Sequence, residues 1–128
     1  MSLEFRITRD GQLLEQYYQL RERCFRSELG LSDFDGSEDE QDRRSHILVA
    51  LREGRCVGGV RISSHISLTS QIDLLGLNQE TCCMWERFAI DPTMRTLYLF
   101  REFSMHLIDA SLESGYSNAM VLSSLTNA

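Results

Sequence analysis

The chain has 128 residues, of which 42% are hydrophobic and 25% charged, and its net charge is −6. These values are typical of one globular domain over residues 1–128, and an acidic chain lacks the basic face that nucleic-acid binding requires. All thirteen basic residues are arginines, which excludes a lysine Schiff base and a P-loop lysine. No apolar run approaches the ~20 residues of a membrane span, and no signal-peptide pattern is present, so we expect a cytoplasmic protein.

The N-terminal third predicts a strand, an amphipathic helix and a polar loop. Residues 3–8 alternate apolar and polar side chains, as in a short strand. A helix is expected over residues 12–28, with Asp10 as its N-cap and Gly30 as its stop. Its two neighbouring stripes are Leu13, Tyr17, Leu20 and Cys24, and Leu14, Tyr18, Arg21 and Phe25. Residues 31–45 contain six acidic side chains and no apolar period, which predicts a long, mobile loop.

The middle of the chain predicts a β-hairpin. Residues 46–51 form a continuous apolar strand, and residues 56–63 form the returning strand after a turn. Period-two alternation places Val57, Gly59 and Arg61 on one face of that strand. The adjacent glycines at 58 and 59 indicate a bulge or the close approach of another backbone.

The C-terminal half predicts a strand, a helix and a last strand. An irregular segment, residues 64–80, contains one helical turn near 72–75 and precedes a strong strand over residues 81–90. A helix follows over residues 94–114, ending at Gly115, and then a strand over residues 118–124. This final β-α-β unit predicts a parallel strand pair, and the hairpin predicts an antiparallel part of the same sheet.

The cysteines and histidines show no catalytic or metal-binding pattern. Cys24, Cys56, Cys82 and Cys83 have neither CxxC nor zinc spacing, so we interpret them as buried free thiols. His46, His65 and His106 have no mutual spacing for a metal, and structural or surface roles are expected. The sequence therefore predicts no metal site.

Four short stretches, in order, resemble the GNAT-type N-acyltransferases. Within that superfamily they look most like acyl-homoserine-lactone (autoinducer) synthases, long-chain N-acyl amino acid synthases and ornithine acyltransferases. They are "LRERCF" with Arg21 and Phe25, "DEQDRRSHILVA" with Asp39 and Asp42, "VGGVRIS" with Gly58 and Arg61, and "WERFAIDP" with Arg87 and Phe88. The resemblance runs from about residue 13 to residue 124. It implies a GNAT-like α/β (α+β) fold, in which a mixed, mostly antiparallel sheet has flanking helices and a splayed parallel strand pair.

Two features depart from the family pattern. The homoserine-lactone branch has a Glu three residues before its Arg, whereas this chain has Met84 there and Glu86 directly before Arg87. Adjacent strand residues face opposite ways, so Glu86 can replace that acid only if a bulge re-aims it. The family also continues with another helix and strand pair, whereas this chain stops at Ala128. The C-terminal strands are then missing, or the domain is short and its open sheet edge pairs with a second copy in a homodimer.

The resemblance implies acyl transfer from a thioester to the amine of a small, amino-acid-like acceptor. The strand over residues 87–91 would receive the acyl carbonyl and the pantetheine arm. Glu86 is the candidate general base, with an ion pair to a neighbouring arginine as the alternative, and Arg87 would order the acidic loop by pairing with Asp39 or Asp42. Arg21 and Arg61 would join the same cluster, because arginines on apolar stretches need carboxylate partners, and a solvated acidic loop is the alternative. The candidate substrate- and acyl-binding residues are Arg21, Phe25, Asp39, Asp42, Arg61, Phe88, Ala89, Ile90, Arg95 and Ser123.

The donor is inferred from the turn before the second long helix. CoA-using members carry Arg/Gln-x-x-Gly-x-Gly/Ala here, and the glycines let backbone amides approach a pyrophosphate. This chain has "RTLYLF" from Arg95, without glycine, which favours an acyl carrier protein over CoA. An ordinary start of a helix is the alternative role for Arg95. An ordinary CoA-dependent acetyltransferase and a non-catalytic binding or dimerisation module are the alternative functions.

Overall fold

One five-stranded sheet forms the centre of the molecule, and the computed structural model describes residues 3–64 and 69–121. The strands lie in chain order and are β1 (Leu3–Ile7), β2 (His46–Arg52), β3 (Arg55–Ser63), β4 (Cys82–Ile90) and β5 (Asn118–Met120). Neighbours from β1 to β4 are antiparallel, and β4 and β5 are parallel. The predicted fold class, a mixed and mostly antiparallel sheet with a parallel pair, is therefore confirmed.

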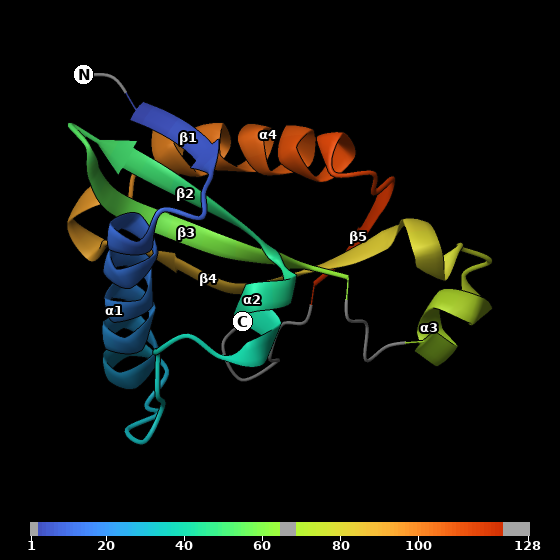
Figure 1. The fold of residues 1–128 in the computed structure, drawn as a ribbon, viewed down its shortest axis with the longest axis horizontal. Helices are drawn as coiled ribbons and strands as arrows, with labels where there is room; N and C mark the ends of the chain where they lie inside the picture. Colours follow the sequence, from blue (N-terminus) through green and yellow to red (C-terminus); the bar gives the residue numbers. More distant parts are fainter. Residues whose placement is uncertain (1–2, 65–68, 122–128) are drawn as a thin grey trace.

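Helices cover both faces of this sheet (Figure 1). They are α1 (Gly11–Glu28), α2 (Glu40–Arg44), α3 (Thr69–Leu74) and α4 (Leu97–Glu113), with 3₁₀ turns η1 (Gln79–Thr81) and η2 (Pro92–Met94). Helices α1 and α2 lie in front of the sheet in Figure 1, α4 lies behind it, and α3 projects beyond the start of β4. None of the described helices is long and apolar enough to cross a membrane.

The core consists of two apolar layers, one on each face of the sheet. Behind the sheet, the buried stripe of α4 packs on Val60 and Ile62 of β3 and Ile90 of β4. That stripe is the predicted one, Leu99, Phe103, Leu107 and Ala110. In front, α1 packs through Leu14, Tyr17, Tyr18, Leu20 and Cys24, whereas Leu13 and Phe25 at the stripe margins are only partly buried. All four cysteines are buried and free, as predicted.

The glycine pair of β3 allows two aromatic rings to reach the sheet backbone. A Cβ at Gly58 would lie 2.8 Å from the Phe103 ring, and one at Gly59 would lie 2.3 Å from the Tyr17 ring. The nearest atoms at both glycines thus belong to side chains, although the Ala89 carbonyl oxygen also lies 3.3 Å from a Cβ at Gly58, and the predicted bulge is present beside this pair. A register shift opposite Ala50 and Leu51 adds a residue to β3, so Val57 packs on the α4 side, and the prediction that it shares a face with Gly59 is wrong.

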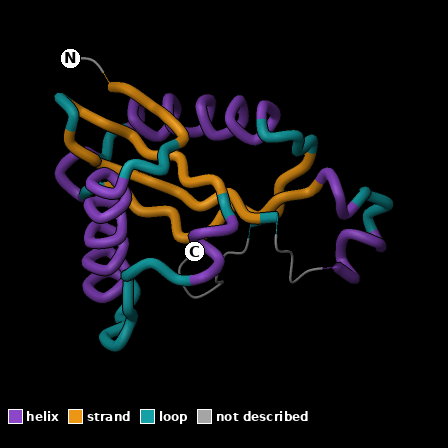
Figure 2. Tube along the Cα trace, viewed as in Figure 1, coloured by secondary structure: helices purple, strands orange, loops and turns teal. Residues whose placement is uncertain are grey.

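Local capping moved several predicted boundaries. The segment 31–45 is not a loop throughout but contains the short helix α2 (Figure 2). A capping box formed by Asp39 and Asp42 starts this helix. Asp10 caps α1 as predicted. Helix α4 begins at Leu97 and not at residue 94, because Asp91 caps η2 and Thr96 then caps α4. The last strand ends at Met120, one residue before the end of the described part, so Val121 is outside the strand, contrary to the prediction, and residues 122–124 lie outside the described residues.

Candidate active site

Strand β4 contains a bulge at Arg87 and Phe88, which together oppose Val60 of β3. The flanking pairs of the ladder are Gly59 with Ala89 and Arg61 with Glu86. Arg87 adopts a left-handed backbone conformation with φ of 56°. The Tyr17 hydroxyl donates a hydrogen bond to the Arg87 carbonyl at 2.7 Å and so ties the bulge to α1.

The bulge places the Glu86 and Arg87 side chains on the same face of the sheet. Glu86 Oε1 accepts a hydrogen bond from Arg61 Nε at 3.1 Å on the face covered by α1. The Arg87 guanidinium lies over the Phe34 ring on that face, whereas the next ring, Phe88, packs on Phe103 of α4. The bulge therefore turns Arg87 to the face of Glu86, whereas Glu86 itself keeps its regular pairing with Arg61, and its role as the acid of the site stays a prediction.

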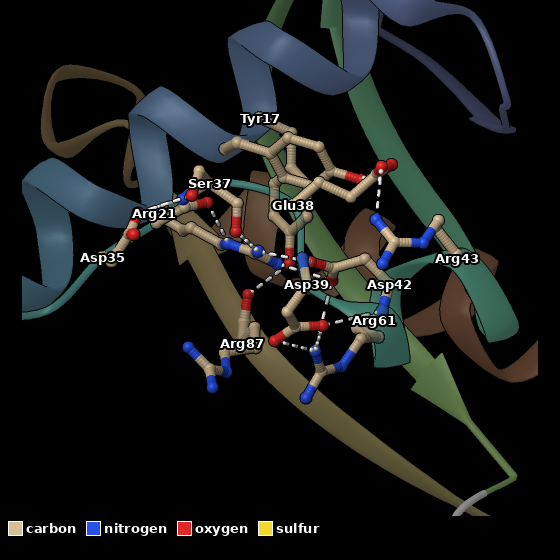
Figure 3. Close-up of polar contacts among 12 residues, drawn as sticks. Tyr17, Arg21, Asp35, Ser37, Glu38, Asp39, Asp42, Arg43, Arg61 and Arg87 are labelled. Carbon is tan, nitrogen blue, oxygen red and sulfur yellow. Dashed lines mark hydrogen bonds and ion pairs between the residues drawn. The ribbon is translucent and has the colours of Figure 1, made fainter.

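Arg21 belongs to an arginine–carboxylate network with Asp39, Asp42 and Arg61 (Figure 3), which Arg61 extends to Glu86. Its guanidinium reaches from α1 to Asp42 of α2 and forms two bonds, of 2.8 and 2.6 Å, with the carboxylate. Both side chains are fully buried. Arg21 also donates to the carbonyls of Gly36 and Ser37, so it fixes the segment that leads into α2.

Arg61 joins this network from β3. Its guanidinium lies 3.2 Å from an oxygen of Asp39 and 3.2 Å from one of Asp42, and it also bonds Glu86. Thus the prediction that Arg21 and Arg61 pair with the two aspartates is confirmed. The prediction that Arg87 forms this pair is wrong, because the two other arginines occupy the carboxylates and the bulge directs Arg87 to Phe34.

Asp42 remains ionised in this buried position. Burial alone would raise the pKa of its carboxyl, but bonds from Arg21 and from the Asp39 backbone N–H, with the charge of Arg61, lower it to about 2. The Asp39 N–H bonds Asp42 Oδ2 at 2.8 Å, which is the second half of the capping box. The charge of Asp42 therefore holds α2 and its flanking segment against α1 and β3.

Arg87 is the exception among the arginines at this site. It is partly buried, and within residues 3–64 and 69–121 it makes no ion pair. Its guanidinium carbon lies 4.7 Å from the centroid of the Phe34 ring. Burial and the neighbouring charges of Arg61 and Arg21 lower the pKa of Arg87, because the protonated form is less well stabilised there than in water.

A hollow of about 200 Å³ opens beside the bulge, at the C-terminal end of β4. Five of the ten predicted substrate- and acyl-binding residues line it, namely Phe25, Phe88, Ala89, Ile90 and Arg95, together with Cys24, Glu28, Leu29 and Phe100. Arg21, Asp39, Asp42 and Arg61 lie instead in the network. Ser123 lies outside the described residues.

The edge of β4 that borders this hollow has no strand partner in the described part of the chain beyond Met84, because β5 pairs only with Cys82, Cys83 and Met84. The Asp91 N–H bonds β3, whereas the Ile90 carbonyl accepts from Arg95 at 2.9 Å, so the main-chain groups of Ile90 face the open edge. Arg95 also forms an ion pair with Glu28 at the end of α1, which spans the hollow.

The N-terminus of α4 follows this hollow without a glycine. Thr96 Oγ1 accepts from the Leu99 N–H at 3.0 Å and so uses one of the free amides of the first turn. Tyr98 and Phe100 stand at the two positions where the CoA-binding pattern has small residues, and their side chains are 60% and 42% exposed. A pyrophosphate would therefore meet bulky side chains and a partly satisfied helix end.

Sequence reasoning missed three residues of this site. The sequence places Tyr17 on the apolar stripe of a helix and Phe34 in a loop, whereas in the structure Tyr17 bonds the bulge and the Arg87 guanidinium lies over the Phe34 ring. Glu28, the partner of Arg95, was the third. The glycine at position 59, opposite Tyr17 on the α1 face, was the available signal for the first of these.

The two histidines in the described part of the chain form no bond with the residues of this site. His46 is exposed at the start of β2 and His106 stacks on Phe5, whereas His65 lies outside the described residues. In the described part of the chain, no group of three or more His, Cys, Asp or Glu side chains is arranged to hold a metal ion.

No protein-family model matches this sequence, and no curated protein matches it. Solved structures do resemble it. A protein from Lactobacillus plantarum described as an N-acetyltransferase has a TM-score of 0.72 at 12% identity, covering 98% of this chain and 78% of that one. AAC(6')-Iy in complex with the bisubstrate analog CoA-S-monomethyl-acetylneamine has a TM-score of 0.70 at 17% identity, covering 99% of this chain and 83% of that one.

A third similar structure is N-acetylglutamate synthase from Neisseria gonorrhoeae, complexed with coenzyme A and N-acetyl-glutamate. Its TM-score is 0.59 at 14% identity, and the match covers 99% of this chain but only 26% of that chain. Identities this low establish a shared fold alone. The chain thus has the fold of these N-acetyltransferases, as the resemblance of its motifs implied.

Proposed function

We propose that this protein is an N-acyltransferase that moves an acyl group from a thioester to the amine of a small, amino-acid-like acceptor. The observation that carries the proposal is the open edge of β4, where a carboxylate, Glu86, is followed by a bulge and then by Phe88, Ala89 and Ile90, which line the hollow. The shared fold supports it, because two of the similar structures contain a CoA-derived ligand.

The open edge of β4 suits a thioester carbonyl. Attack by an amine makes a tetrahedral intermediate whose oxyanion needs hydrogen-bond donors. Ile90 directs its main-chain groups to that edge, so its N–H is available to a carbonyl or to the amides of a pantetheine arm. Arg95 would leave the Ile90 carbonyl when such an arm binds.

Glu86 is the group that would accept the proton from the amine. Its Oε1 is held by Arg61, which fixes the carboxylate beside the bulge. A base in this position acts directly on the ammonium group or through one water molecule. The ion pair with Arg61, which the sequence offered as the alternative role, is present and orients this base.

The donor we favour is an acyl carrier protein. The bulky first turn of α4 and the Thr96 cap disfavour a pyrophosphate cradle, and a carrier protein presents a single phosphate on a flexible arm. The similar structures with CoA-derived ligands favour a second candidate, a CoA-dependent acetyltransferase. Arg95 at the head of α4 would contact the phosphate in either case.

Acyl transfer should be assayed with acyl carrier protein and with acetyl- and octanoyl-CoA as donors and a panel of amino acids as acceptors. We expect turnover with the carrier-protein donor, and about a hundredfold or greater loss in the Glu86→Gln variant. The exposed Glu113→Gln on α4 is the matched control and should retain activity. Turnover with CoA donors alone would establish the second candidate, and absence of turnover with every donor would contradict the proposed function.

A further inference from the structure

We propose that Arg87 binds the carboxylate group of the acceptor, which makes the substrates amino acids and related amines with a free carboxylate. The inference rests on the proposed acyl-transfer function and names its acceptor class. It starts from the contrast between Arg87 and its neighbours. Arg21 and Arg61 are saturated by Asp39, Asp42 and Glu86, whereas Arg87 has no carboxylate partner in the described part of the chain.

A partly buried cation without a counter-ion is unfavourable, so its position calls for an anionic ligand. Burial and the charges of Arg61 and Arg21 make the protonated form of Arg87 less stable, and they therefore lower its pKa. A bound carboxylate would supply the missing negative charge and two acceptor oxygens, which match the planar fork of a guanidinium.

The platform beneath Arg87 is fixed before any ligand binds. Phe34 carries the guanidinium on its ring, and the Phe34 carbonyl accepts from Arg26 Nε at 2.7 Å. Two residues further on, Arg21 holds the Gly36 carbonyl at 2.9 Å. The side chain of Arg87 is thus positioned by a loop that is hydrogen-bonded to α1 at two points, as a binding residue requires.

Arg87 adjoins the hollow that would receive the thioester. Phe88, the next residue of the bulge, lines the hollow, and so does Phe25, whose ring lies 4.7 Å from the Phe34 ring. Glu86 precedes Arg87 on the same face. An α-amino acid carries its carboxylate next to its amine, so a carboxylate on Arg87 leaves the amine near Glu86 and the thioester.

A donor phosphate is the other source of an anion, and the geometry places it elsewhere. The hollow continues from Phe88 to Arg95, at the head of α4. A pantetheine arm that runs along the open edge of β4 directs its phosphate toward Arg95, away from the bulge. Arg87 is therefore assigned to the acceptor and not to the donor.

The test compares glycine, L-serine, L-methionine and L-phenylalanine with their α-carboxamides, first by isothermal titration and then by acyl transfer. The wild type should bind at least one acid about tenfold or more tightly than its amide. Arg87→Gln should abolish this preference by raising the acceptor KM, with the donor KM unchanged. Arg87→Lys keeps the charge but lacks the planar guanidinium, so it should retain part of the preference for acids. Arg23→Gln, on the exposed face of α1, is the control and should leave both the preference and the KM values unchanged.

Each outcome decides the proposal. Failure of the wild type to distinguish acids from amides, or an unchanged preference in Arg87→Gln, overturns it, as does a rise in the donor KM alone. If Arg87→Gln does not fold, Phe34→Leu removes the platform and should reduce the acid preference severalfold, and an unchanged preference there overturns it. Selective binding of acids without any acyl transfer would leave the anion site in place and refute the proposed function instead.

Discussion

Arg21 shows what a buried charge requires at the scale of one residue. Its guanidinium lies in the middle of an otherwise apolar face of α1, where an unpaired cation would cost several kcal/mol. The Asp42 carboxylate and two backbone carbonyls satisfy it, and the rings of Tyr17 and Tyr18 flank it at 5.2 and 4.5 Å. The stability of the fold should therefore depend most on keeping both members of the Arg21–Asp42 pair, because removing one leaves the other buried without a counter-charge.

Replacing Asp42 with Asn should destabilise the fold by about 3 kcal/mol or more, because Arg21 then stays buried without a counter-charge. Urea denaturation followed by circular dichroism measures the effect. The control is Glu40→Gln, which removes the exposed pair with Arg44 and should cost less than about 1 kcal/mol. If Asp42→Asn and Glu40→Gln lowered the free energy of unfolding by similar amounts, the buried Arg21–Asp42 pair would not be what holds α2 in place.

At the scale of elements, β3 and β4 form the site because neither strand is regular. The bulge in β4 turns Glu86 and Arg87 to one face, and Tyr17 holds that bulge from α1. Tyr17 can reach the Arg87 carbonyl only because Gly59 has no side chain beneath the ring. Gly59 of β3 thus allows the contact that holds the bulge of β4.

Gly59→Ala should destabilise the protein by about 1–3 kcal/mol, since the added methyl overlaps the Tyr17 ring and displaces it. Acyl transfer should fall as well, because the displaced hydroxyl no longer holds the bulge. Gly11→Ala is the matched control, since a Cβ there meets nothing within 4 Å, and it should stay within about 0.5 kcal/mol of the wild type. In a Tyr17→Leu background, Gly59→Ala should lower the free energy of unfolding by less than in the wild type. Equal losses in both backgrounds would refute the overlap between the added methyl and the Tyr17 ring.

The elements that could be predicted are those with a long apolar period. Helices α1 and α4 and strands β2 to β4 were expected close to their observed bounds, and Arg21 was expected to need a carboxylate because it interrupts an apolar stripe. Helix α2 was missed because its five residues are all polar, and only the spacing of Asp39 and Asp42 marked its capping box.

The position of Arg87 could not be predicted, since it depends on a register shift between two strands. Pairing across a sheet is set by the whole set of contacts and not by the residues of one strand. The same holds for Val57, whose face changed at the β3 bulge. Period-two alternation fails at both bulges, and the bulge in β4 is the one that brings Arg87 to the same face as Glu86.

At the scale of the whole molecule, the arginine–carboxylate network joins four parts that are distant in sequence. Arg21 comes from α1, Asp39 and Asp42 from the start of α2, Arg61 from β3 and Glu86 from β4. The network therefore ties the segment that carries Phe34 to the sheet. Its strength must depend on pH, because its central carboxyl has a pKa of about 2, below its ordinary value of 3.8.

A carboxyl with a lowered pKa stabilises the fold above its ordinary pKa and loses that contribution as the pH falls through the folded-state value. Asp42 should thus contribute fully above about pH 5, and about 2 kcal/mol should be lost between pH 4 and pH 2. The free energy of unfolding, measured by urea denaturation from pH 7 to pH 2, should fall less steeply in Asp42→Asn across that window. Asp109→Asn, on the exposed side of α4, should parallel the wild type. Parallel curves for wild type and Asp42→Asn would show that Asp42 does not drive the acid transition.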